Sequence, residues 1–253
     1  MSTLIEITSL TIGYNNQPLL TGINLTSSTG QLIAVIGRNG KGKSTLLKTL
    51  SGLLSPIAGS FKYEGKNMLN LPEKERARLL SIVITKQVDI GGLKVYDYIA
   101  YGRYPYTNWL GINTDTDDDE VKKAIEYCGL EEFSYRNFNE LSDGEKQKVN
   151  IARAIAQDTP LIILDEPTAH LDLINKVEIL KLLKHLVDNY SKTIIISTHQ
   201  IEYALQICNE IWVVNDAVKT YTPSEMIKQN KLKELFGEDL IRFNEASYSF
   251  KLT

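Results

Sequence analysis

The sequence predicts an α/β fold in which a mostly parallel sheet is flanked by helices. Apolar runs over 32–36, 161–164 and 193–197 have the length of strands and lack polar alternation, as strands covered on both faces do. The stretch 94–157 is poor in strand patterns and predicts an inserted helical subdomain. The first residues of the chain predict an N-terminal antiparallel β subdomain, which completes the fold class.

The N-terminal residues show the alternating pattern of strands that have one buried face and one solvent-exposed face. Apolar and polar side chains alternate over 4–10 and again over 23–26. Turn-forming residues stand between these two segments: Gly13, Asn15, Asn16 and Pro18. We therefore expect the chain to open with an antiparallel pair of strands.

A glycine-rich turn follows the apolar run 32–36 directly. The residues from Ser44 to Leu50, after this turn, predict a helix. A strand, a glycine-rich turn and a helix in this order form the layout on which phosphate sites are built.

The second half of the chain continues the same sheet. The stretch 173–189 predicts a helix between the apolar runs 161–164 and 193–197, so the three segments form a βαβ unit. The last part of the chain predicts only short helices, at 223–228 and 231–236.

Helical spacing is visible within the inserted stretch. Val121, Ala124, Ile125 and Cys128 recur at the intervals of one helix face. The acidic run 115–120 precedes them, and acidic side chains in a first helical turn interact favourably with the helix dipole. We interpret this run as a helix start and not as a metal site.

Composition and charge exclude several classes of protein. With 253 residues, of which 43% are hydrophobic, the chain can bury a substantial interior. A formal charge of -3 and a pI near 5.7 leave no basic surplus, so nucleic acid is not an expected partner.

The apolar runs fall far short of the roughly 20 residues that cross a bilayer, and the first residues lack the features of a secretory signal. Cys128 and Cys208 are expected to be unpaired.

A phosphate-binding motif occupies the glycine-rich turn. Residues 37–44 match G-x-x-x-x-G-K-[ST] in full, between a buried strand and a helix, which makes the fold a P-loop NTPase core. Lys43 would reach the β and γ phosphates, and the Ser44 hydroxyl would bind Mg²⁺. The nucleotide-binding residues expected here are Gly37, Arg38, Asn39, Gly40, Lys41, Gly42, Lys43, Ser44 and Thr45.

Two carboxylates end the apolar run 161–164. Ligands of open α/β sheets bind at the carboxyl ends of the strands, so Asp165 and Glu166 are placed for a role at the phosphates. Asp165 suits the anchoring of Mg²⁺. Glu166 follows it in the turn and is our candidate for the base that polarises the attacking water.

A third motif gives the chain a family resemblance. The sequence Leu-Ser-Asp-Gly-Glu at 141–145 follows the phosphate loop and precedes the two carboxylates. In this order the motifs resemble those of the nucleotide-binding subunits of ABC transporters, whose signature is L-S-G-G-Q. The resemblance covers the chain from Tyr14 to about Asn215. P-loop kinases and GTPases lack this element.

The signature motif has both a structural and a functional interpretation. Ser142 and Glu145 have the spacing of a capping box at a helix start. The resemblance implies that the Ser142 hydroxyl and the Gly144 amide contact the γ-phosphate of ATP held by the opposite subunit. Asp143 and Glu145 depart from the family pattern and would repel a phosphate on direct contact. We therefore expect both side chains to turn away, Glu145 into its own cap.

The resemblance also implies roles for single residues. Tyr14 would stack on adenine, Gln87 would contact Mg²⁺ and the attacking water, Asp172 would cross the dimer interface, and His199 would contact the γ-phosphate. His170 stands where the family has a small residue, and we assign it no chemistry.

The expected organisation is a single ABC ATPase domain over 1–253. Residues 1–87 and 159–215 would form the nucleotide-binding core with its β subdomain, and 88–158 the helical signature subdomain. Residues 216–253 would form a short C-terminal extension.

The resemblance implies an ATPase that works as a head-to-tail dimer of two copies with ATP and Mg²⁺ between them. The tyrosine-rich stretch 95–106 resembles the importer branch that serves iron(III)-siderophores, haem or cobalamin. In that branch the ATPase is peripheral, on the cytoplasmic face of the inner membrane. It docks to two transmembrane permease subunits and acts indirectly with a periplasmic or lipoprotein substrate-binding protein.

Several alternatives remain beside this interpretation. The first is a soluble ABC-type ATPase without a transporter, such as an iron–sulfur assembly factor. A translation or repair ATPase is disfavoured because the chain has one phosphate loop and one signature, and a non-enzymatic binding module is disfavoured by Glu166 and His199. A GTPase would need N-K-x-D, which residues 175–178 approach without its Asp.

Overall fold

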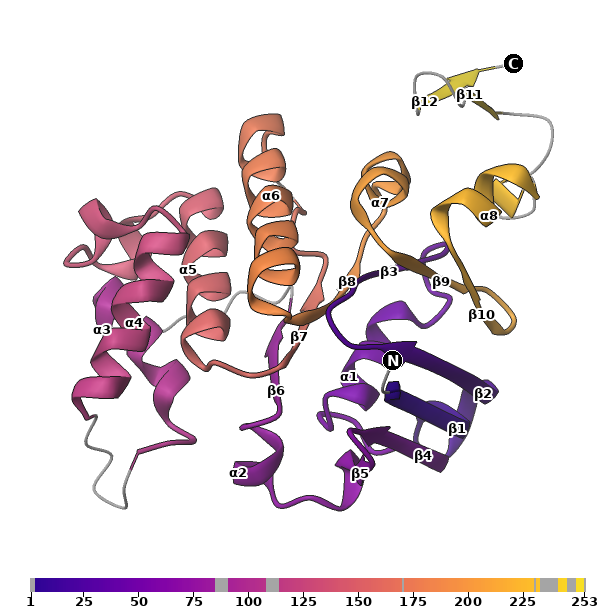
Figure 1. Ribbon diagram of the computed structural model, residues 1–253, viewed down its shortest axis with the longest axis horizontal. Helices are drawn as coiled ribbons and strands as arrows, with labels where there is room; N and C mark the ends of the chain where they lie inside the picture. The colour runs from indigo at the N-terminus through magenta and orange to yellow at the C-terminus, as the bar shows by residue number, and fades with distance from the viewer. Residues whose placement is uncertain are drawn as a thin grey trace. The chain divides into compact units, whose positions relative to one another are not determined.

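The chain divides into two units, residues 1–70 with 193–253 (the first unit) and residues 71–192 (the second unit). Figure 1 shows both in a computed structural model, coloured along the chain. The structure describes residues 3–84, 91–107, 114–169, 171–229, 231–232, 241–244 and 249–252.

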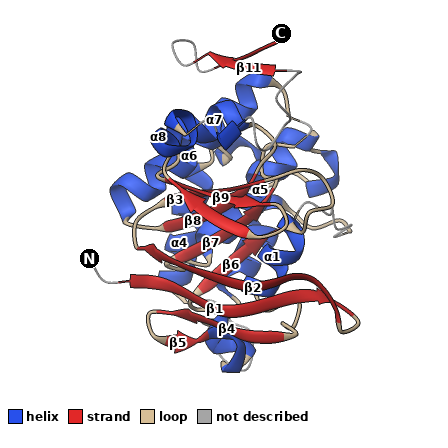
Figure 2. Cartoon of the chain, turned by 90° about the vertical axis from the view of Figure 1, so that its right-hand side faces the viewer, coloured by secondary structure: helices blue, strands red, loops and turns tan. Residues whose placement is uncertain are grey.

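An antiparallel sheet opens the first unit. Its strands are β1 (Thr3–Tyr14), β2 (Gln17–Ser28), β4 (Ala58–Tyr63) and β5 (Lys66–Asn67), in the spatial order β2-β1-β4-β5. Figure 2 shows β2, β1 and β4 running side by side. The predicted antiparallel β subdomain is thus confirmed.

The first two strands are longer than the sequence pattern predicts. They meet at a turn of Asn15 and Asn16, which have φ values of 50° and 60°. Positive φ at both central residues gives the hairpin turn whose twist matches the twist of the strands. Pairing therefore begins directly beside the turn, with Tyr14 opposite Gln17, and the strands absorb the residues expected to form a loop.

The second sheet of the first unit is mostly parallel. Its strands have the order β10-β9-β3-β8, formed by β10 (Val218–Tyr221), β9 (Glu210–Val214), β3 (Leu32–Ile36) and β8 (Thr193–Ser197). β3 pairs in parallel with β8 and with β9, and β10 pairs antiparallel to β9. Every residue of β3 and β8 is buried, as their continuous apolar sequences predict.

Short helices complete the first unit. They are α1 (Lys43–Leu50), the 3₁₀ helix η1 (Met68–Asn70), α7 (Ile201–Ile207) and α8 (Pro223–Lys228). α1 contacts both β1 and β8, and α7 contacts β3 and α8. Near the C-terminus, β11 (Ile241–Asn244) and β12 (Ser249–Leu252) form a separate antiparallel pair.

The second unit contains two parallel strands and most of the helices. The strands β6 (Leu80–Val83) and β7 (Leu161–Asp165) pair directly. The helices, with 3₁₀ helices written η, are α2 (Glu73–Arg76), α3 (Val95–Ala100), η2 (Tyr101–Arg103), α4 (Asp115–Tyr127), η3 (Glu131–Phe133), η4 (Phe138–Glu140), α5 (Asp143–Ala156) and α6 (Leu173–Tyr190). α5 packs against α3 and α4, which stand beside it in Figure 1.

The predicted fold class is confirmed, and so are most of the predicted helices. The helix expected from Ser44 to Leu50 begins one residue earlier, and the helix expected at 223–228 has those bounds. Of the segment 231–236, only 231–232 are described, so the helix expected there is untested. The proposed boundaries at 87, 158 and 215 also remain a prediction.

The structure bears on two further expectations. Cys128 and Cys208 are both buried and free. Among the helices of the described ranges, none combines the length and the apolar character of a membrane span.

A buried ion pair stabilises the helical part of the second unit. Arg103 Nε donates to Asp117 Oδ1 at 2.8 Å, and both side chains are less than 10% exposed. Arg103 Nη1 also donates to the carbonyl of Ala156, at the end of α5. Burial alone would raise the pKa of Asp117, but hydrogen bonds from Thr114 and Arg103 hold that pKa below its ordinary value. The acidic run therefore does more than meet the dipole of α4.

We predict that Arg103→Met destabilises the protein by about 3–5 kcal/mol, because the substitution leaves the Asp117 carboxylate buried without its partner. The shift of the urea unfolding midpoint measures this loss at neutral pH. Since the folded-state pKa of Asp117 is lowered, the pair stabilises the fold above the ordinary Asp pKa. The stabilisation is lost as pH falls through the lowered value.

Lys122→Met is the matched control, because Lys122 forms an exposed pair with Asp119 on the same helix at 3.7 Å. It should shift the free energy of unfolding by less than about 0.5 kcal/mol. Equal midpoints for the two variants would show that the buried pair does not stabilise the unit.

Candidate nucleotide-binding and hydrolysis site

The phosphate loop, residues 37–44, joins the end of β3 to the start of α1 in the first unit. Its backbone has positive φ at Gly37, Gly40 and Gly42. A Cβ on Gly37 would lie 2.2 Å from the carbonyl oxygen of Val214, so any side chain there would collide with β9. Only a glycine-rich loop fits this path, and such a loop lets backbone amides surround a phosphate.

Lys43 places a buried positive charge inside this loop. Its side chain is nearly buried, and Nζ donates to the carbonyl oxygens of Gly37 at 2.9 Å and Arg38 at 3.3 Å. A buried ammonium group is costly unless it is hydrogen-bonded or paired with a negative charge. The two carbonyl oxygens are neutral acceptors, and hydrogen bonds to the charged oxygens of a phosphate are stronger than hydrogen bonds to neutral acceptors.

Tyr14 lies beside the same loop. Its hydroxyl is 3.2 Å from Oγ1 of Thr45, within hydrogen-bond distance, and its side chain is 50% exposed. The hairpin turn after Tyr14 holds the ring at the end of β1. A half-exposed ring next to the phosphate loop is available for stacking on a base.

His199 follows β8 at the same sheet edge as the phosphate loop. β3 and β8 are parallel neighbours with Val35 opposite Ser197, so their carboxyl ends meet. The amide of Thr198 donates to the carbonyl of Val35 at 3.2 Å, which fixes the segment that carries the exposed His199. Within the first unit, the structure therefore brings together Tyr14, the phosphate loop and His199.

Sequence reasoning missed an ion pair that fixes the outer side of the loop. Nζ of Lys41 lies 2.9 Å from Oδ1 of Asp216, in the turn between β9 and β10. No local pattern signals this contact, because 175 positions separate the two residues in sequence. Sequence reasoning also did not place Leu19 beside the loop. Leu19 is 44% exposed, and its Cδ2 would lie 3.0 Å from a Cβ on Gly42.

Asp165 and Glu166 lie at the end of β7 in the second unit. Asp165 is 5% exposed and Glu166 is half-buried. Glu166 has a φ of 51°, which is uncommon for a residue with a side chain, and its carbonyl accepts a hydrogen bond from Ala169. Strained backbone of this kind is concentrated at functional sites. The turn also separates the two carboxylates into a buried one and an accessible one.

The signature motif begins α5 with the predicted capping box. The backbone amide and the hydroxyl of Ser142 both donate to Oε2 of Glu145 at 2.7 Å, and the amide of Glu145 reaches Ser142 Oγ at 3.4 Å. These hydrogen bonds from Ser142 hold the pKa of Glu145 below its ordinary value. The expectation that Glu145 turns into its own cap is thus confirmed. The hydroxyl of Ser142 is on an exposed residue and is already engaged.

Asp172 caps α6 and lies close to the signature motif. Its carboxylate accepts from the backbone amide of Asn175 at 2.8 Å and from the Asn175 side-chain amide at 3.0 Å. The same Asn175 side chain abuts Gly144, where a Cβ would lie 3.2 Å from Nδ2. Asn175 therefore links Asp172 to the signature motif. The sequence analysis compared residues 175–178 only with the N-K-x-D element of GTPases and did not predict this contact.

The residues present suit a nucleotide and a hard cation. The loop of positive-φ glycines around the Lys43 ammonium fits phosphate oxygens. Ser44, in the first unit, supplies a hydroxyl, and Asp165, in the second unit, supplies a buried carboxylate; each is an oxygen ligand of the kind that Mg²⁺ prefers. Gln87 and His170 lie outside the described residues. In the part of the chain that the structure describes, His, Cys, Asp and Glu form no cluster that could hold a metal by themselves.

Comparison with known proteins identifies the family. The family model described as ABC transporter matches residues 20–169. An ABC transporter ATP-binding protein of Methanocaldococcus jannaschii is 36% identical over 251 residues, which cover 98% of this chain and 87% of that protein. The chain belongs to the ABC transporter family of ATP-binding proteins. This ABC ATPase therefore has the activity that its motifs predict, the hydrolysis of ATP.

Two further similarities concern importers. The iron(3+)-hydroxamate import ATP-binding protein of Bacillus subtilis is 34% identical over 232 residues, which cover 91% of the present chain and 86% of that protein. An ABC transporter described as metal-chelate type, in an inward-facing conformation, matches with a TM-score of 0.81 at 28% identity. That match covers 99% of the present chain and 96% of the transporter's chain.

We predict that Tyr14→Ala weakens ATP binding by about ten-fold, because stacking of one base on an aromatic ring contributes roughly 1–3 kcal/mol. Tyr14→Phe is the matched control, since it keeps the ring and removes only the hydroxyl near Thr45. Equilibrium binding of a fluorescent ATP analogue to each full-length variant measures the difference. Equal affinities for the two variants would remove Tyr14 from the adenine site.

Proposed function

We propose that this ABC ATPase powers the import of an iron(III)-siderophore, haem or cobalamin, by hydrolysing ATP between two copies of itself. The observation that carries the proposal is that one chain holds a complete phosphate loop around Lys43 and a signature helix whose N-cap residue, Ser142, is exposed. The similarity to an iron(3+)-hydroxamate import protein supports the class of cargo. The alternative of an ABC-type ATPase without a transporter gains no support from the relatives described above.

Nucleotide binding is assigned to the first unit. Lys43 would donate to the β and γ phosphates in place of the loop carbonyls, and the loop amides would complete the cradle. Tyr14 would stack on the adenine ring. His199 would contact the γ-phosphate from the sheet edge that it shares with the loop.

The residues assigned to hydrolysis come mainly from the second unit. Glu166 would orient the attacking water and accept its proton, which suits a carboxylate that is accessible in the turn after β7. Ser44 and Asp165 would hold Mg²⁺, with Gln87 as a further candidate ligand. The bound ion would supply positive charge beside the phosphates.

The partner copy would contribute Ser142 and Gly144. The positive end of the α5 dipole and the Ser142 hydroxyl suit a terminal phosphate. Next to Asp172, Leu173 and Ile174 are 64% and 71% exposed at the start of α6. Exposed apolar side chains beside the signature motif support an interface with a second copy there. Such an arrangement is a head-to-tail dimer.

The membrane partners are proposed from the second unit as well. Tyr101 and Tyr104, directly after α3, are 57% and 71% exposed. Tyrosine is enriched in protein interfaces, so this surface is a candidate contact for the two transmembrane permease subunits. The ATPase would then lie peripherally on the cytoplasmic face of the inner membrane. A periplasmic or lipoprotein substrate-binding protein would act with it only through the permease.

We predict that Glu166→Gln lowers ATP turnover by at least about 100-fold, because the amide cannot accept the proton of the attacking water. Unhydrolysed ATP should then hold two copies together, and size-exclusion chromatography with Mg²⁺ and ATP should show a dimer. Glu126→Gln, which removes an exposed carboxylate on α4, is the control and should behave as wild type.

Two outcomes of this experiment would count against the proposal. Full turnover by Glu166→Gln would exclude Glu166 as the base. If cells that carry Glu166→Gln in place of the wild-type gene take up radiolabelled iron(III)-siderophore, haem and cobalamin at the normal rate, the ATPase does not power import of these cargoes.

A second prediction concerns the departure from the family signature. In the proposed dimer, the Glu145 carboxylate competes with a γ-phosphate for the Ser142 hydroxyl and adds a negative charge beside it. Glu145→Gln keeps the capping box and removes the charge. We predict that this variant forms the ATP-bound dimer at about thirty-fold lower protein concentration, as expected for the removal of roughly 1 kcal/mol of repulsion in water at each of the two sites of the dimer.

The dependence of the hydrolysis rate on protein concentration measures this change. Glu140→Gln removes an exposed charge just before the motif without touching the cap, so it should leave the concentration dependence unchanged. A Glu145→Gln variant that dimerises no better than wild type would show that the carboxylate does not oppose the trans contact.

A further inference from the structure

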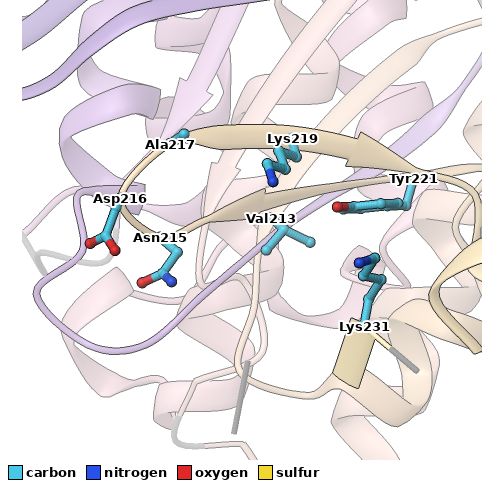
Figure 3. Close-up of a pocket in the computed structure, with 7 residues that line it drawn as sticks. All are labelled: Val213, Asn215, Asp216, Ala217, Lys219, Tyr221 and Lys231. Atoms are coloured by element: carbon cyan, nitrogen blue, oxygen red, sulfur yellow. The ribbon is translucent and has the colours of Figure 1, made fainter. Parts of the chain in front are cut away.

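A cavity of about 220 Å³ opens on the hairpin of β9 and β10 in the first unit, and Figure 3 shows its lining. The charged residues of the lining are Asp216, Lys219 and Lys231. Asp216 pairs with Lys41, and Lys231 has an interaction partner of its own. Charges of both signs, two of them already engaged, favour no class of ligand.

A salt bridge in the second unit connects the signature helix to the next helix along the chain. Nζ of Lys148 on α5 lies 2.6 Å from Oε2 of Glu178 on α6. The side chain of Lys148 is 21% exposed and that of Glu178 is 53% exposed, so solvent reaches one side of the pair. Figure 1 shows the two helices next to each other, although 30 positions separate the two residues in sequence. Neither residue belongs to the nucleotide site described above.

The salt bridge lies near the beginning of both helices. The N-cap residue of α5 is Ser142, and that of α6 is Asp172. Because one helical turn takes about 3.6 residues, Lys148 and Glu178 each lie within two turns of these caps. The bridge therefore joins the segment that begins with the signature motif to the segment that begins with Asp172.

A second contact joins the same two helix starts. The Asn175 side chain abuts Gly144, where a Cβ would lie 3.2 Å from Nδ2. Gly144 and Lys148 are four positions apart on α5, which places them on one face of that helix. Asn175 and Glu178 are three positions apart on α6, so they also share a face. Two contacts at different levels resist both sliding and rotation of the helix starts, whereas a single contact would leave a pivot.

We propose that Lys148 and Glu178 are positioning residues, whose salt bridge fixes the start of α6 against the signature motif. The start of α6 carries Asp172 and the exposed apolar side chains of Leu173 and Ile174. With the bridge in place, both parts of the surface offered to a second copy are ordered before the copies meet. Order that exists before association lowers the cost of binding. The use of the bridge by a dimer rests on the proposed function, whereas its effect on the two helix starts does not.

Another salt bridge between the same segments provides a matched control. Nζ of Lys192, shortly after α6, lies 2.6 Å from Oδ1 of Asp158, shortly after α5. The two side chains are 20% and 53% exposed, nearly the values of the first bridge. We therefore expect the two bridges to stabilise the fold to a similar extent. Only the bridge of Lys148 and Glu178 lies beside the helix starts, so a general loss of stability would appear equally in variants of either bridge.

Hydrogen exchange of single backbone amides tests the bridge in the full chain without nucleotide. The amides to follow are those of Glu145 and Asn175, which donate to the cap side chains of α5 and α6. Lys148→Met and Glu178→Met each keep an unbranched side chain and remove the charge. Each should raise both exchange rates about two- to five-fold, because loss of a partly exposed pair makes local opening modestly more frequent.

The double variant should exchange no faster than either single variant, since both changes break one contact. Lys192→Met should leave both amide rates unchanged. The proposal is overturned if Lys148→Met and Glu178→Met exchange at the wild-type rate, or if Lys192→Met accelerates the two amides equally.

The concentration dependence of ATP hydrolysis tests what the bridge does for the dimer. At saturating Mg²⁺ and ATP, Lys148→Met and Glu178→Met should both raise the protein concentration that gives half-maximal turnover about two- to five-fold. A direct effect of charge on the γ-phosphate would have opposite signs in the two variants, because one loses a positive and the other a negative charge. The affinity of dilute protein for a fluorescent ATP analogue should not change, because the phosphate loop lies in the first unit. Lys192→Met is again the control.

The outcomes separate the bridge from the proposed function. Shifts of opposite sign, or equal half-maximal concentrations for wild type and Lys148→Met, would overturn the role of the bridge in the dimer. Turnover per copy that does not depend on the concentration of wild type would refute the proposed dimer itself. The exchange rates, which need no dimer, would still decide whether the bridge holds the two helix starts.

Discussion

The buried ammonium group of Lys43 is the constraint on which the nucleotide site depends. A charge that is nearly excluded from water needs close hydrogen-bond acceptors or negative partners, and the carbonyl oxygens of Gly37 and Arg38 are two such acceptors. The neighbouring strands and the helix hold Lys43 and the loop in this position. β3 is buried along its whole length, β9 limits position 37 to glycine, and α1 begins at Lys43 itself. A site built in this way is prepared for phosphate before the ligand arrives.

The start of α5 shows how one local motif can serve both folding and binding. Ser142 and Glu145 satisfy each other's orphan donors, which stabilises the helix start in the absence of ligand. The same Ser142 hydroxyl is the group that the proposed trans contact requires. Replacing Gln of the family pattern with Glu therefore strengthens the free form of the motif relative to the bound form. Glu and Gln have nearly the same shape, so the capping box is kept. The negative charge of Glu, however, would repel a phosphate bound beside it.

Contacts between segments that are distant in sequence determine the surroundings of the signature motif and of the phosphate loop. Asn175 links the cap of α6 to Gly144, so the residue assigned to the dimer interface and the signature motif share one side chain. Asp216 links the β9–β10 turn to Lys41 of the phosphate loop. The second link holds the β9–β10 turn against the outer side of the phosphate loop.

The sequence by itself determined the fold class, the order of the main strands and helices, and the local geometry of each motif. These follow from hydrophobic periodicity, turn chemistry and capping, which act over a few neighbouring residues; the glycine loop before α1 and the Ser142 cap are examples. Only the tertiary structure decided the partners of Arg103, Gly144 and Lys41, and it alone formed the cavity around Lys219. Such contacts depend on how whole elements pack, and no local pattern records which surfaces will meet.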